Sequence, residues 1–378
     1  MSETNEYAKA GVDYQKIMPF KKIMIETGNK TREFPRKRHV VVSPGGGYKF
    51  EFSFGDVEPL WYQVTEGLGH KSLIAQWMYE NSGTGKTYHE NIGVDTMLMA
   101  INDLIAKGFL PVVYTSEVSA SSSEWFSDET RARDVAHGFF EECKRDGIAL
   151  IGGESEALPF FIKTKPYVKE GAVFSGCAGG FIHELGVLEP SITFPITGES
   201  ITRGDIIIGV TSSGLHSNGS SLIIKKSLEL PEQLLTRLPD GNTLGDAVLV
   251  PTKSYVSLVD ELLRLEIEIH GFQPITGGGV SKIAFNKKSL TYRIYNWVEV
   301  PTLFKFMQEL GTGVKDLLTT FNRGIGYCIF VPREEVAYTI ETGQDLGYEL
   351  VEIGRVEEGE RKVIFEPENN LVLYPPNL

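Results

Sequence analysis

Stretches with strand character and stretches with helix character alternate along the whole chain, and this alternation most restricts its fold. In the first half we predict strands at 39–44, 49–54, from 109 onward, 149–154 and 171–182, and helices at 72–80, 91–108 and 128–146. In the second half we predict strands at 205–214, 327–332 and 362–366, and helices at 218–229, 254–265 and 301–311. Such alternation predicts an α/β or α+β fold.

The chain divides into two predicted domains. Its 378 residues suffice for roughly two domains of ~150 residues each. Residues 183–205 are rich in turn-forming residues, so we place the junction there and predict an N-terminal domain over 1–186 and a C-terminal domain over 187–378. Near the start, the apolar spacing over 12–26 predicts a helix that breaks at Pro19.

Composition excludes several classes of protein. Lys plus Arg is 37 and Asp plus Glu is 50, a net charge of −13, which disfavours binding to a nucleic-acid backbone but permits a small phosphorylated ligand. The longest nearly apolar stretch, 171–182, is shorter than the about 20 residues of a membrane span, and the polar N-terminus lacks a secretory core. Three widely spaced cysteines predict a reducing, cytoplasmic location without disulfides.

The 40 glycines exceed the usual ~7% share, and they occur in clusters. One cluster, 83–87, resembles the end of a phosphate-binding P-loop. The complete motif needs a further glycine where this chain has Glu80, as well as a preceding strand, whereas a helix is predicted there. We therefore predict an ordinary surface turn at 83–87.

Two segments in the first half combine glycine with acidic and basic side chains. The turn from Thr65 to Lys71 could offer backbone amides and an ammonium to phosphate while Glu66 holds Mg²⁺; an ordinary strand-to-helix turn is the alternative. Asp95 lies seven and eight residues before Asn102 and Asp103, so both acids can share a helix face. The alternative is a helix-terminal charge and one solvated acid.

Further glycine-rich segments follow predicted strands. Gly152, Gly153 and Glu154 come at a strand end, where α/β folds tend to bind ligands. The segment 212–219 (SSGLHSNG) follows another strand and carries an imidazole, hydroxyls and an amide between glycines. An ordinary turn and a polar helix cap are the respective alternatives. The segments 276–279 (TGGG) and 321–326 (FNRGIG) repeat the pattern.

The ordered set GVD (11–13), TEGLGHK (65–71), GVD…NDL (93–104), GGE (152–154), SSGLHSNG, TGGG and FNRGIG resembles the aminoimidazole ribonucleotide synthetase family, also called phosphoribosylformylglycinamidine cyclo-ligase. The resemblance covers nearly the whole chain. It implies an N-terminal α/β domain that pairs its sheet with that of a second subunit, and a C-terminal α+β domain. ATP and a small phosphorylated substrate would bind in the cleft between them.

The resemblance also implies roles for individual residues. The implied metal ligands are Glu66, Asp95, Asp103 and Glu154, which would hold Mg²⁺ against ATP. The implied catalytic residues are Asp103, His216 and Lys71, with Lys71 neutralising phosphate and His216 moving a proton because imidazole titrates near neutrality. The implied nucleotide- and substrate-binding residues are Gly45, Gly46, Gly47, Thr65, Gly67, Gly69, Asn102, Gly152, Gly153, Ser217, Asn218, Gly277 and Gly278, together with the 321–326 loop.

The implied reaction is ATP-dependent closure of an imidazole ring in purine biosynthesis, in which the formyl amide oxygen of formylglycinamidine ribonucleotide is phosphorylated before ring closure. The chain departs from the family pattern at Glu66 and His70, where an aspartate and a small hydroxyl residue are usual, and at Ala157, where a second glutamate is usual. Two alternatives therefore stay open. One is a kinase or ligase of the same fold acting on another small phosphorylated metabolite, and the other is a non-catalytic binding member.

Overall fold

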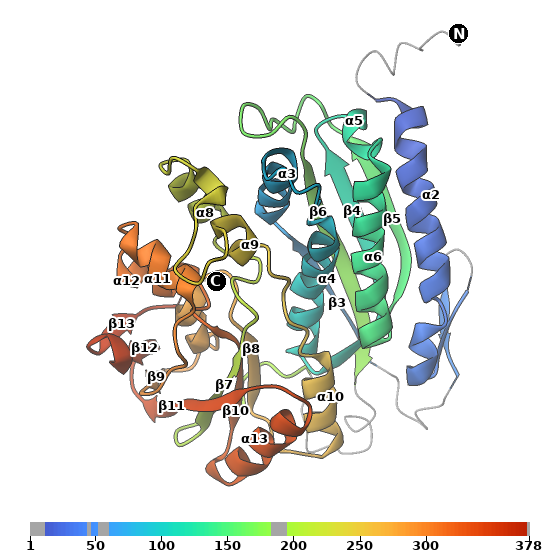
Figure 1. Cartoon of the computed structure of the whole chain (residues 1–378). Coiled ribbons are helices and arrows are strands. Elements are labelled where there is room, and N and C mark those ends of the chain that lie inside the picture. The colour runs from blue at the N-terminus through green and yellow to red at the C-terminus, as the bar shows by residue number, and fades with distance from the viewer. Residues whose placement is uncertain (1–11, 44–46, 52–59, 183–194, 376–378) are drawn as a thin grey trace, which may run out of the picture.

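A four-stranded sheet forms the centre of the N-terminal domain. The computed structural model describes residues 12–43, 47–51, 60–182 and 195–375, which form two domains side by side (Figure 1). In sheet order the N-terminal strands are β3 (Trp61–Gly67), β6 (Ala172–Ile182), β4 (Phe109–Ala120) and β5 (Ala149–Ala157). β4 and β5 run parallel and the other neighbours antiparallel. β3 and β5 are therefore the two edges of this sheet.

Helices cover one face of the sheet. They are α2 (Tyr14–Thr31), α3 (Lys71–Asn81), α4 (His89–Ile105), α5 (Ser123–Phe126) and α6 (Glu129–Asp146). α4 packs on β3 and β6, α6 packs on α4, and α2 packs on α6 and β5. A short 3₁₀ helix, η1 (Phe34–Arg38), leads to the antiparallel pair β1 (Val40–Val42) and β2 (Tyr48–Phe50). Gly45, Gly46 and the predicted domain boundary at 186 lie outside the described residues.

Local signals explain why α6 was predicted within a residue of its ends. The Asp128 carboxylate accepts the backbone N–H of Arg131 at 3.0 Å, which caps the first turn. Gly147 has φ +74°, a left-handed conformation that ends helices. Its buried residues recur every three or four positions and face α4 and the sheet.

The predicted break at Pro19 is wrong, because α2 continues through this residue to Thr31. Pro19 is the sixth residue of the helix, so it removes one backbone hydrogen bond near the start. The loss is offset by burial of the face that contains Ile17 and Phe20, with Phe20 packed edge-on to Phe126 at 5.2 Å. Packing thus overrides a local helix breaker.

The crossing of α4 and α6 depends on glycine, and alanine at Gly138 should destabilise the domain. A Cβ at Gly138 would lie 2.0 Å from the carbonyl oxygen of Glu90, and one at Gly93 would lie 2.7 Å from that of Val135. We expect Gly138→Ala to lower the free energy of unfolding by about 1–3 kcal/mol despite alanine's better helix propensity. Urea unfolding measures it, and Thr130→Ala on the exposed face of α6 is the control. A Gly138→Ala protein as stable as its parent would contradict this close helix contact.

The C-terminal domain contains a seven-stranded sheet. In sheet order its strands are β13 (Leu371–Leu373), β12 (Lys362–Phe365), β9 (Leu290–Ile294), β11 (Leu350–Glu358), β7 (Ile206–Thr211), β10 (Ile325–Val331) and β8 (Gly271–Pro274). Its α-helices are α8 (Ser220–Ser227), α9 (Leu244–Val248), α10 (Val256–Arg264), α11 (Thr302–Glu309), α12 (Val314–Thr320) and α13 (Val336–Asp345). Its 3₁₀ helices are η2 (Gln233–Leu235), η3 (Gly279–Ala284), η4 (Arg333–Glu335) and η5 (Glu366–Glu368). The pair β12–β9 is parallel and the other pairs are antiparallel.

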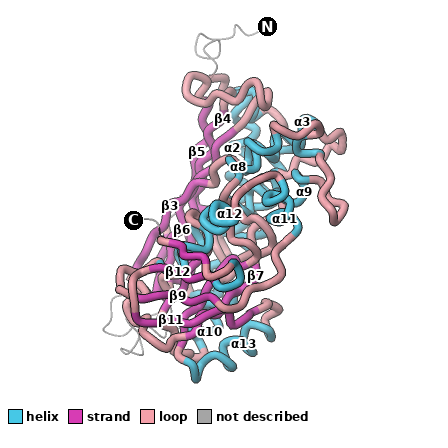
Figure 2. The backbone as a smooth tube through the Cα atoms, turned by 90° about the vertical axis from the view of Figure 1, so that its left-hand side faces the viewer, coloured by secondary structure: helices cyan, strands magenta, loops and turns pink. Residues whose placement is uncertain are grey.

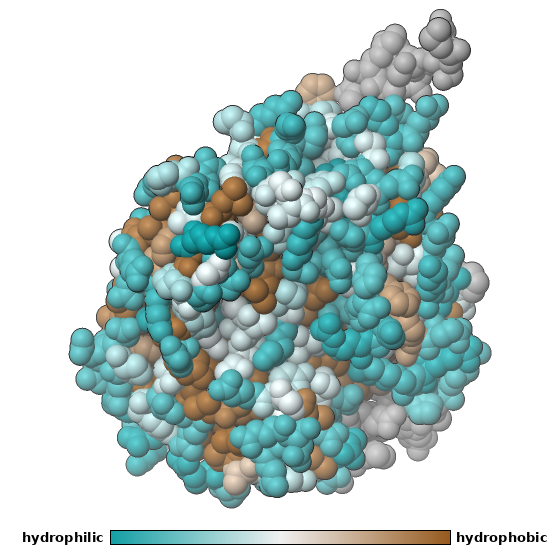
Figure 3. All heavy atoms as spheres, viewed as in Figure 1, coloured by the Kyte–Doolittle hydropathy of each residue, from teal (hydrophilic) through white to brown (hydrophobic). Residues whose placement is uncertain are grey.

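The two domains share one continuous hydrophobic core, which runs from the N-terminal helices to one face of the C-terminal sheet. Both views show α10 and α13 side by side at one end of the C-terminal domain (Figure 1, Figure 2). Hydrophilic side chains dominate the face seen in Figure 3, and hydrophobic ones form separate small areas. In the described part of the chain, helices that could cross a membrane are absent. The turn at 83–87 joins α3 to α4, as predicted.

Candidate functional site

The contact between the two domains encloses a cavity of about 250 Å³. β3 and the C-terminal end of α4 form its N-terminal wall, and β8 and η3 form its C-terminal wall. Its lining residues are Tyr62, Val64, Asp103, Ala106, Lys107, Gln273, Pro274 and Lys282. We call this space the interdomain cavity.

One carboxylate, Asp103, lines this cavity, and a second, Glu66, lies next to it on the same face of β3 as the lining residues Tyr62 and Val64. Burial raises the pKa of Glu66, and the charge of Asp103 raises it further. Burial also raises the pKa of Asp103, against the opposing effect of Lys282 and then Lys107. The two acids are thus near enough to repel each other in a poorly hydrated place.

These two acids fit a divalent cation. The Oδ1 atom of Asp103 is enclosed and has no hydrogen-bond partner among the described residues. A cation shared with Glu66 would supply that partner and relieve the repulsion between the acids. Mg²⁺ commonly takes one or two protein carboxylates together with phosphate oxygens, so this pair suits it.

Two lysines at the cavity were missed in the sequence. Lys107 follows Asp103 by four residues, a helical spacing that could have indicated the pair. Burial lowers the pKa of Lys107, and the charge of Asp103 opposes this shift. Lys282 donates to the Thr276 hydroxyl at 2.5 Å, and only its nearness to the TGGG segment could have drawn attention to it. Together they can neutralise a phosphorylated ligand.

Lys71 and Asp95 form a fully buried ion pair, with 2.8 Å between Nζ and Oδ2. Lys71 also donates to the carbonyl oxygens of His216 at 2.6 Å and Val250 at 2.8 Å, so three oxygens surround its ammonium group. The other oxygen of Asp95 accepts the amide and hydroxyl of Thr252 at 2.8 and 2.6 Å. Burial lowers the pKa of Lys71 and raises that of Asp95, and the pairing opposes both shifts.

Asn102 continues this set of contacts between the domains. Its amide donates to the carbonyl of Lys253 at 3.0 Å and accepts from the backbone N–H of Tyr255 at 3.3 Å. Lys71, Asp95 and Asn102 therefore fasten α3 and α4 to the C-terminal segment 250–255. We call them the interdomain network.

His216 is buried beside this network, with a left-handed φ of +59°. Its Nε2 accepts the backbone N–H of Ser213 at 3.3 Å, and a Cβ at Gly326 would come within 2.4 Å of its Cε1. Burial, together with Lys71 and Lys253, lowers the pKa of His216 to about 3. In this geometry the imidazole is a neutral hydrogen-bonding group. A role for His216 in moving a proton stays a prediction.

The three glycine-rich segments of the C-terminal domain converge. Asn322 donates to the carbonyls of Gly214 at 2.8 Å and Leu215 at 3.1 Å, which joins the 321–326 loop to the 212–219 loop. The Nδ2 of Asn218 is buried without a partner among the described residues, and its Oδ1 faces Gly277. Asn218 thus has a free donor where these loops meet.

The remaining predicted binding residues lie at several separate places, and Ser217 is the one beside the network. The Ser217 hydroxyl is 3.3 Å from that of Thr252. Gly278 has φ +93°, which lets the chain turn into η3. Thr65 and Gly67 alternate with Glu66 and therefore point to the other face of β3, while Gly69 has φ +73° in the turn before α3. Gly47 immediately precedes β2, far along the chain from these loops.

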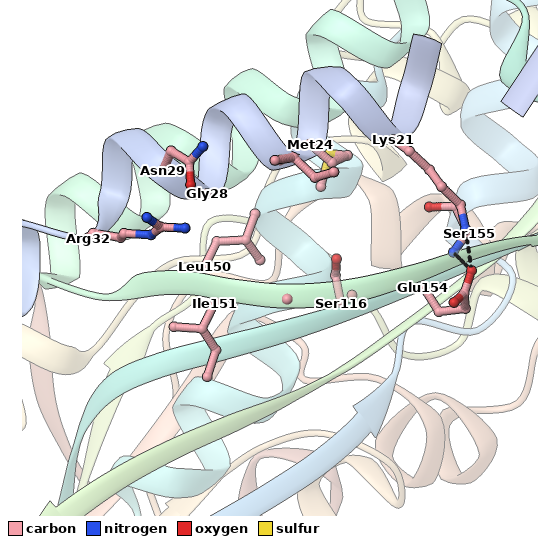
Figure 4. Close-up of a pocket in the computed structure, with 13 residues that line it drawn as sticks. Lys21, Met24, Gly28, Asn29, Arg32, Ser116, Leu150, Ile151, Glu154 and Ser155 are labelled. Atoms are coloured by element: carbon pink, nitrogen blue, oxygen red, sulfur yellow. Dashed lines mark hydrogen bonds and ion pairs between the residues drawn. The ribbon is translucent and has the colours of Figure 1, made fainter. Parts of the chain in front are cut away.

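Gly152, Gly153 and Glu154 lie at a different place, the outer edge strand β5. There they border a cavity of about 150 Å³ between β5 and α2 (Figure 4). Glu154 pairs with Lys21 of α2 at 2.7 Å, and Arg32 lies at the other end of the cavity (Figure 4). A Cβ at Gly153 would lie 2.4 Å from the carbonyl oxygen of Ser116, so glycine is required where β5 passes β4.

The four acids predicted as one metal set do not come together. Glu66 and Glu154 stand on opposite edges of the sheet. Asp95 and Asp103 are eight residues apart on one helix, about 12 Å at 1.5 Å per residue. Within the described residues, no group of three or more His, Cys, Asp or Glu is placed to hold a metal. Glu66 and Asp103 remain as the pair that fits one.

Glu142 of α6 is buried near the interdomain network, as Asp95 is, and it should make the free energy of unfolding depend on pH. Burial, and then the nearby Asp146, raise the pKa of Glu142 well above its ordinary value. The folded protein keeps this proton while the unfolded chain releases it above about pH 4.5, so stability falls as pH rises past that value. Arg145, whose Nη1 lies 2.9 Å from Oε2 of Glu142, opposes this rise in the pKa. We expect the stability advantage of Glu142→Gln over the parent to grow as the pH rises above about 4.5, by at most about 1.4 kcal/mol for each pH unit. Urea unfolding at each pH measures this, with the exposed Glu129→Gln as control; a constant difference would contradict it.

Comparison with known proteins agrees with this two-domain arrangement. Residues 60–179 match the model for the N-terminal domain of AIR synthase related proteins, and residues 202–366 match the model for their C-terminal domain. The phosphoribosylformylglycinamidine cyclo-ligase of Pyrococcus horikoshii is 31% identical over 369 residues, covering 96% of each chain. That of Caldanaerobacter subterraneus is 32% identical, covering 95% of this chain and 99% of its own.

Solved structures show the same fold at lower identity. The hydrogenase maturation protein HypE in complex with ATP has a TM-score of 0.57 and 14% identity, covering 87% of this chain and 88% of its own. The thiamine-monophosphate kinase of Stenotrophomonas maltophilia has a TM-score of 0.57 and 17% identity, covering 89% of this chain and 95% of its own. At these identities the likeness supports the fold alone.

Proposed function

Because the chain belongs to the AIR synthase related family, we propose that it is an ATP-dependent cyclo-ligase that converts formylglycinamidine ribonucleotide to aminoimidazole ribonucleotide. The curated relatives that carry this name match over almost the entire length of both chains. The observation in this structure that carries the proposal is the interdomain cavity. There, Glu66 and Asp103 face Lys107 and Lys282 between the two domains.

The proposed reaction needs charge stabilisation more than it needs a nucleophilic side chain. ATP transfers its γ-phosphoryl group to the formyl amide oxygen, which releases ADP and turns that oxygen into a leaving group. The amidine nitrogen then attacks the activated carbon, the ring closes and phosphate departs. Positioned charges and amide donors are what such a transfer requires.

The cavity residues divide this work. Glu66 and Asp103 would hold Mg²⁺, which when bound supplies positive charge against the phosphate oxygens. Lys107 and Lys282 add charge from the sides of the cavity. The free Nδ2 of Asn218, beside Gly277, is suited to hold the substrate. Lys71, Asp95 and Asn102 act in this proposal by positioning the segment 250–255 rather than by touching phosphate.

The proposal includes a homodimer in the cytoplasm. In the family pattern the N-terminal sheet meets that of a second subunit, and here the described α-helices of this domain cover one face of the sheet (Figure 1). The cavity at β5, with Gly152, Gly153 and Lys21, would then lie beside the subunit contact and take part of the nucleotide. Light scattering after size-exclusion chromatography tests the oligomeric state, and a monomer at micromolar concentration would contradict this part.

Incubation of the purified protein with ATP, Mg²⁺ and formylglycinamidine ribonucleotide tests the function. We expect stoichiometric ADP and an aminoimidazole product. ADP with a phosphorylated product that keeps the open chain would indicate a kinase or another ligase of the same fold. Nucleotide binding without ADP release would indicate a non-catalytic member, and either result would reject the cyclo-ligase proposal.

A further inference from the structure

A second cavity lies in the C-terminal domain, away from the interdomain cavity. Its volume is about 440 Å³, and it shares no lining residue with the interdomain cavity. The segment 295–300, which follows β9, forms one wall, and Phe365, Pro367 and Glu368 form another. Trp297 packs edge-on to Phe365 with ring centroids 5.0 Å apart, so part of the lining is aromatic.

Arg323 borders this cavity and is only 4% exposed. Its Nη2 pairs with Oε1 of Glu368 at 3.1 Å. Its Nε and Nη1 are both enclosed and have no hydrogen-bond partner among the described residues. A guanidinium carries five N–H donors, and leaving several of them buried and unused costs free energy. The described part of the chain therefore leaves two nitrogens of this guanidinium without an acceptor.

The backbone holds Arg323 in place at some cost. Its φ is +48°, a left-handed conformation that is uncommon for residues other than glycine. The indole N–H of Trp297 donates to its carbonyl at 3.0 Å, and the side chain of Asn322 accepts the next backbone N–H, that of Gly324, at 2.9 Å. Asn322 contacts the 212–219 loop, whereas the guanidinium of the next residue, Arg323, borders the 440 Å³ cavity. The same short loop thus serves two separate places.

We propose that this cavity binds a small organic anion whose carboxylate or phosphate takes the place of Glu368 and pairs with Nη1 and Nη2 of Arg323, while its flat body lies against Trp297. Arginine presents two parallel N–H groups that match two oxygens of either anion. The aromatic lining favours a ring over a bare ion. Glu368 now supplies the only negative charge within contact of this guanidinium among the described residues, so it competes with such a ligand.

Calorimetric titration of the full chain tests the proposal, with benzoate and phenyl phosphate as probes and benzyl alcohol as the uncharged control. Each is titrated with and without saturating ATP and Mg²⁺, which separates this cavity from the nucleotide site. We expect one or both anions to bind in either condition and the alcohol not to bind. A preference between the two anions identifies whether carboxylates or phosphates are the natural class.

Three variants locate the binding. Arg323→Met should weaken it roughly tenfold or more, and Arg323→Lys should do so too, because lysine keeps the charge without the paired donors. Glu368→Gln should strengthen it severalfold. If Arg323→Met does not fold, the affinities of Glu368→Gln and Arg323→Lys still test the proposal. Three results would each overturn the proposal. The first is equal affinity in the parent, Arg323→Lys and Glu368→Gln, and the second is binding of the alcohol as tight as that of the anions. The third is no binding of either anion by the parent and by Glu368→Gln. Because binding is measured without turnover, the result is independent of the cyclo-ligase assay.

Discussion

Asp103→Asn is expected to reduce ATP-dependent turnover roughly a hundredfold or more, the scale seen when one preorganised group that stabilises transferred charge is lost. Asp103 lines the interdomain cavity, and its enclosed Oδ1 has no hydrogen-bond partner in the described part of the chain. Asparagine has the same shape, so the change removes charge and little else. We expect kcat to fall and the Mg²⁺ concentration for half-maximal rate to rise.

Folding stability separates this catalytic effect from a structural one. Burial raises the pKa of Asp103, so its ionised form is disfavoured in the folded protein and the neutral amide should not lower the free energy of unfolding. Asp240→Asn, in an exposed turn of the C-terminal domain, is the matched control. A fully active Asp103→Asn protein would remove this residue from the metal site, and an unfolded one would show a structural role instead.

Glu66→Asp refines the same test, since it shortens the side chain by one methylene while keeping the charge. Glu66 is half-buried and its pKa responds to Asp103, so the two carboxylates act on each other across the cavity. If both hold one cation, Glu66→Asp should change the Mg²⁺ requirement while retaining most of the turnover. An unchanged Mg²⁺ requirement in Glu66→Asp and Glu66→Gln alike would exclude Glu66 as a ligand.

Local signals predicted much of the fold and little of the site. The cap at Asp128 and the stop at Gly147 are properties of neighbouring residues, so α6 could be placed from the sequence. α2 could not be, because the burial of Phe20 that carries the helix through Pro19 comes from distant segments. The site shows the same contrast between features set by neighbouring residues and features set by distant ones.

Helical spacing brought Asp95 and Asp103 onto one face, which made them look like a pair of metal ligands. Two turns of rise keep them apart, and each has a different neighbour from elsewhere in the chain. Asp95 contacts Lys71 and Thr252, whereas Asp103 lies close enough to Glu66 to raise its pKa. Such pairings depend on how the domains dock, and residue spacing carries no information about docking. Motifs therefore identified residues of the right type without assigning their roles.

Lys71→Met is expected to lower the free energy of unfolding by about 3–5 kcal/mol, because it leaves Asp95 buried without its counter-charge. Both side chains are completely buried, and Lys71 also holds the carbonyls of His216 and Val250. The double variant Lys71→Met with Asp95→Asn removes both charges, and it should recover part of the loss. Urea unfolding of the single and double variants, in a double-mutant cycle, measures the coupling.

The cycle distinguishes the two roles that Lys71 can have. If Lys71 fastens the domains, Lys71→Met loses stability in the absence of ATP, and Lys315→Met on the exposed surface of α12 does not. If Lys71 instead neutralises phosphate, stability without ATP stays near that of the parent while the KM for ATP rises. The ion pair and the two hydrogen bonds of Lys71, at 2.6 to 2.8 Å, favour the first outcome, since withdrawing the ammonium toward a ligand would leave an aspartate and two carbonyls unpaired in the core. A stable Lys71→Met protein with weakened ATP binding would restore the residue to the catalytic set.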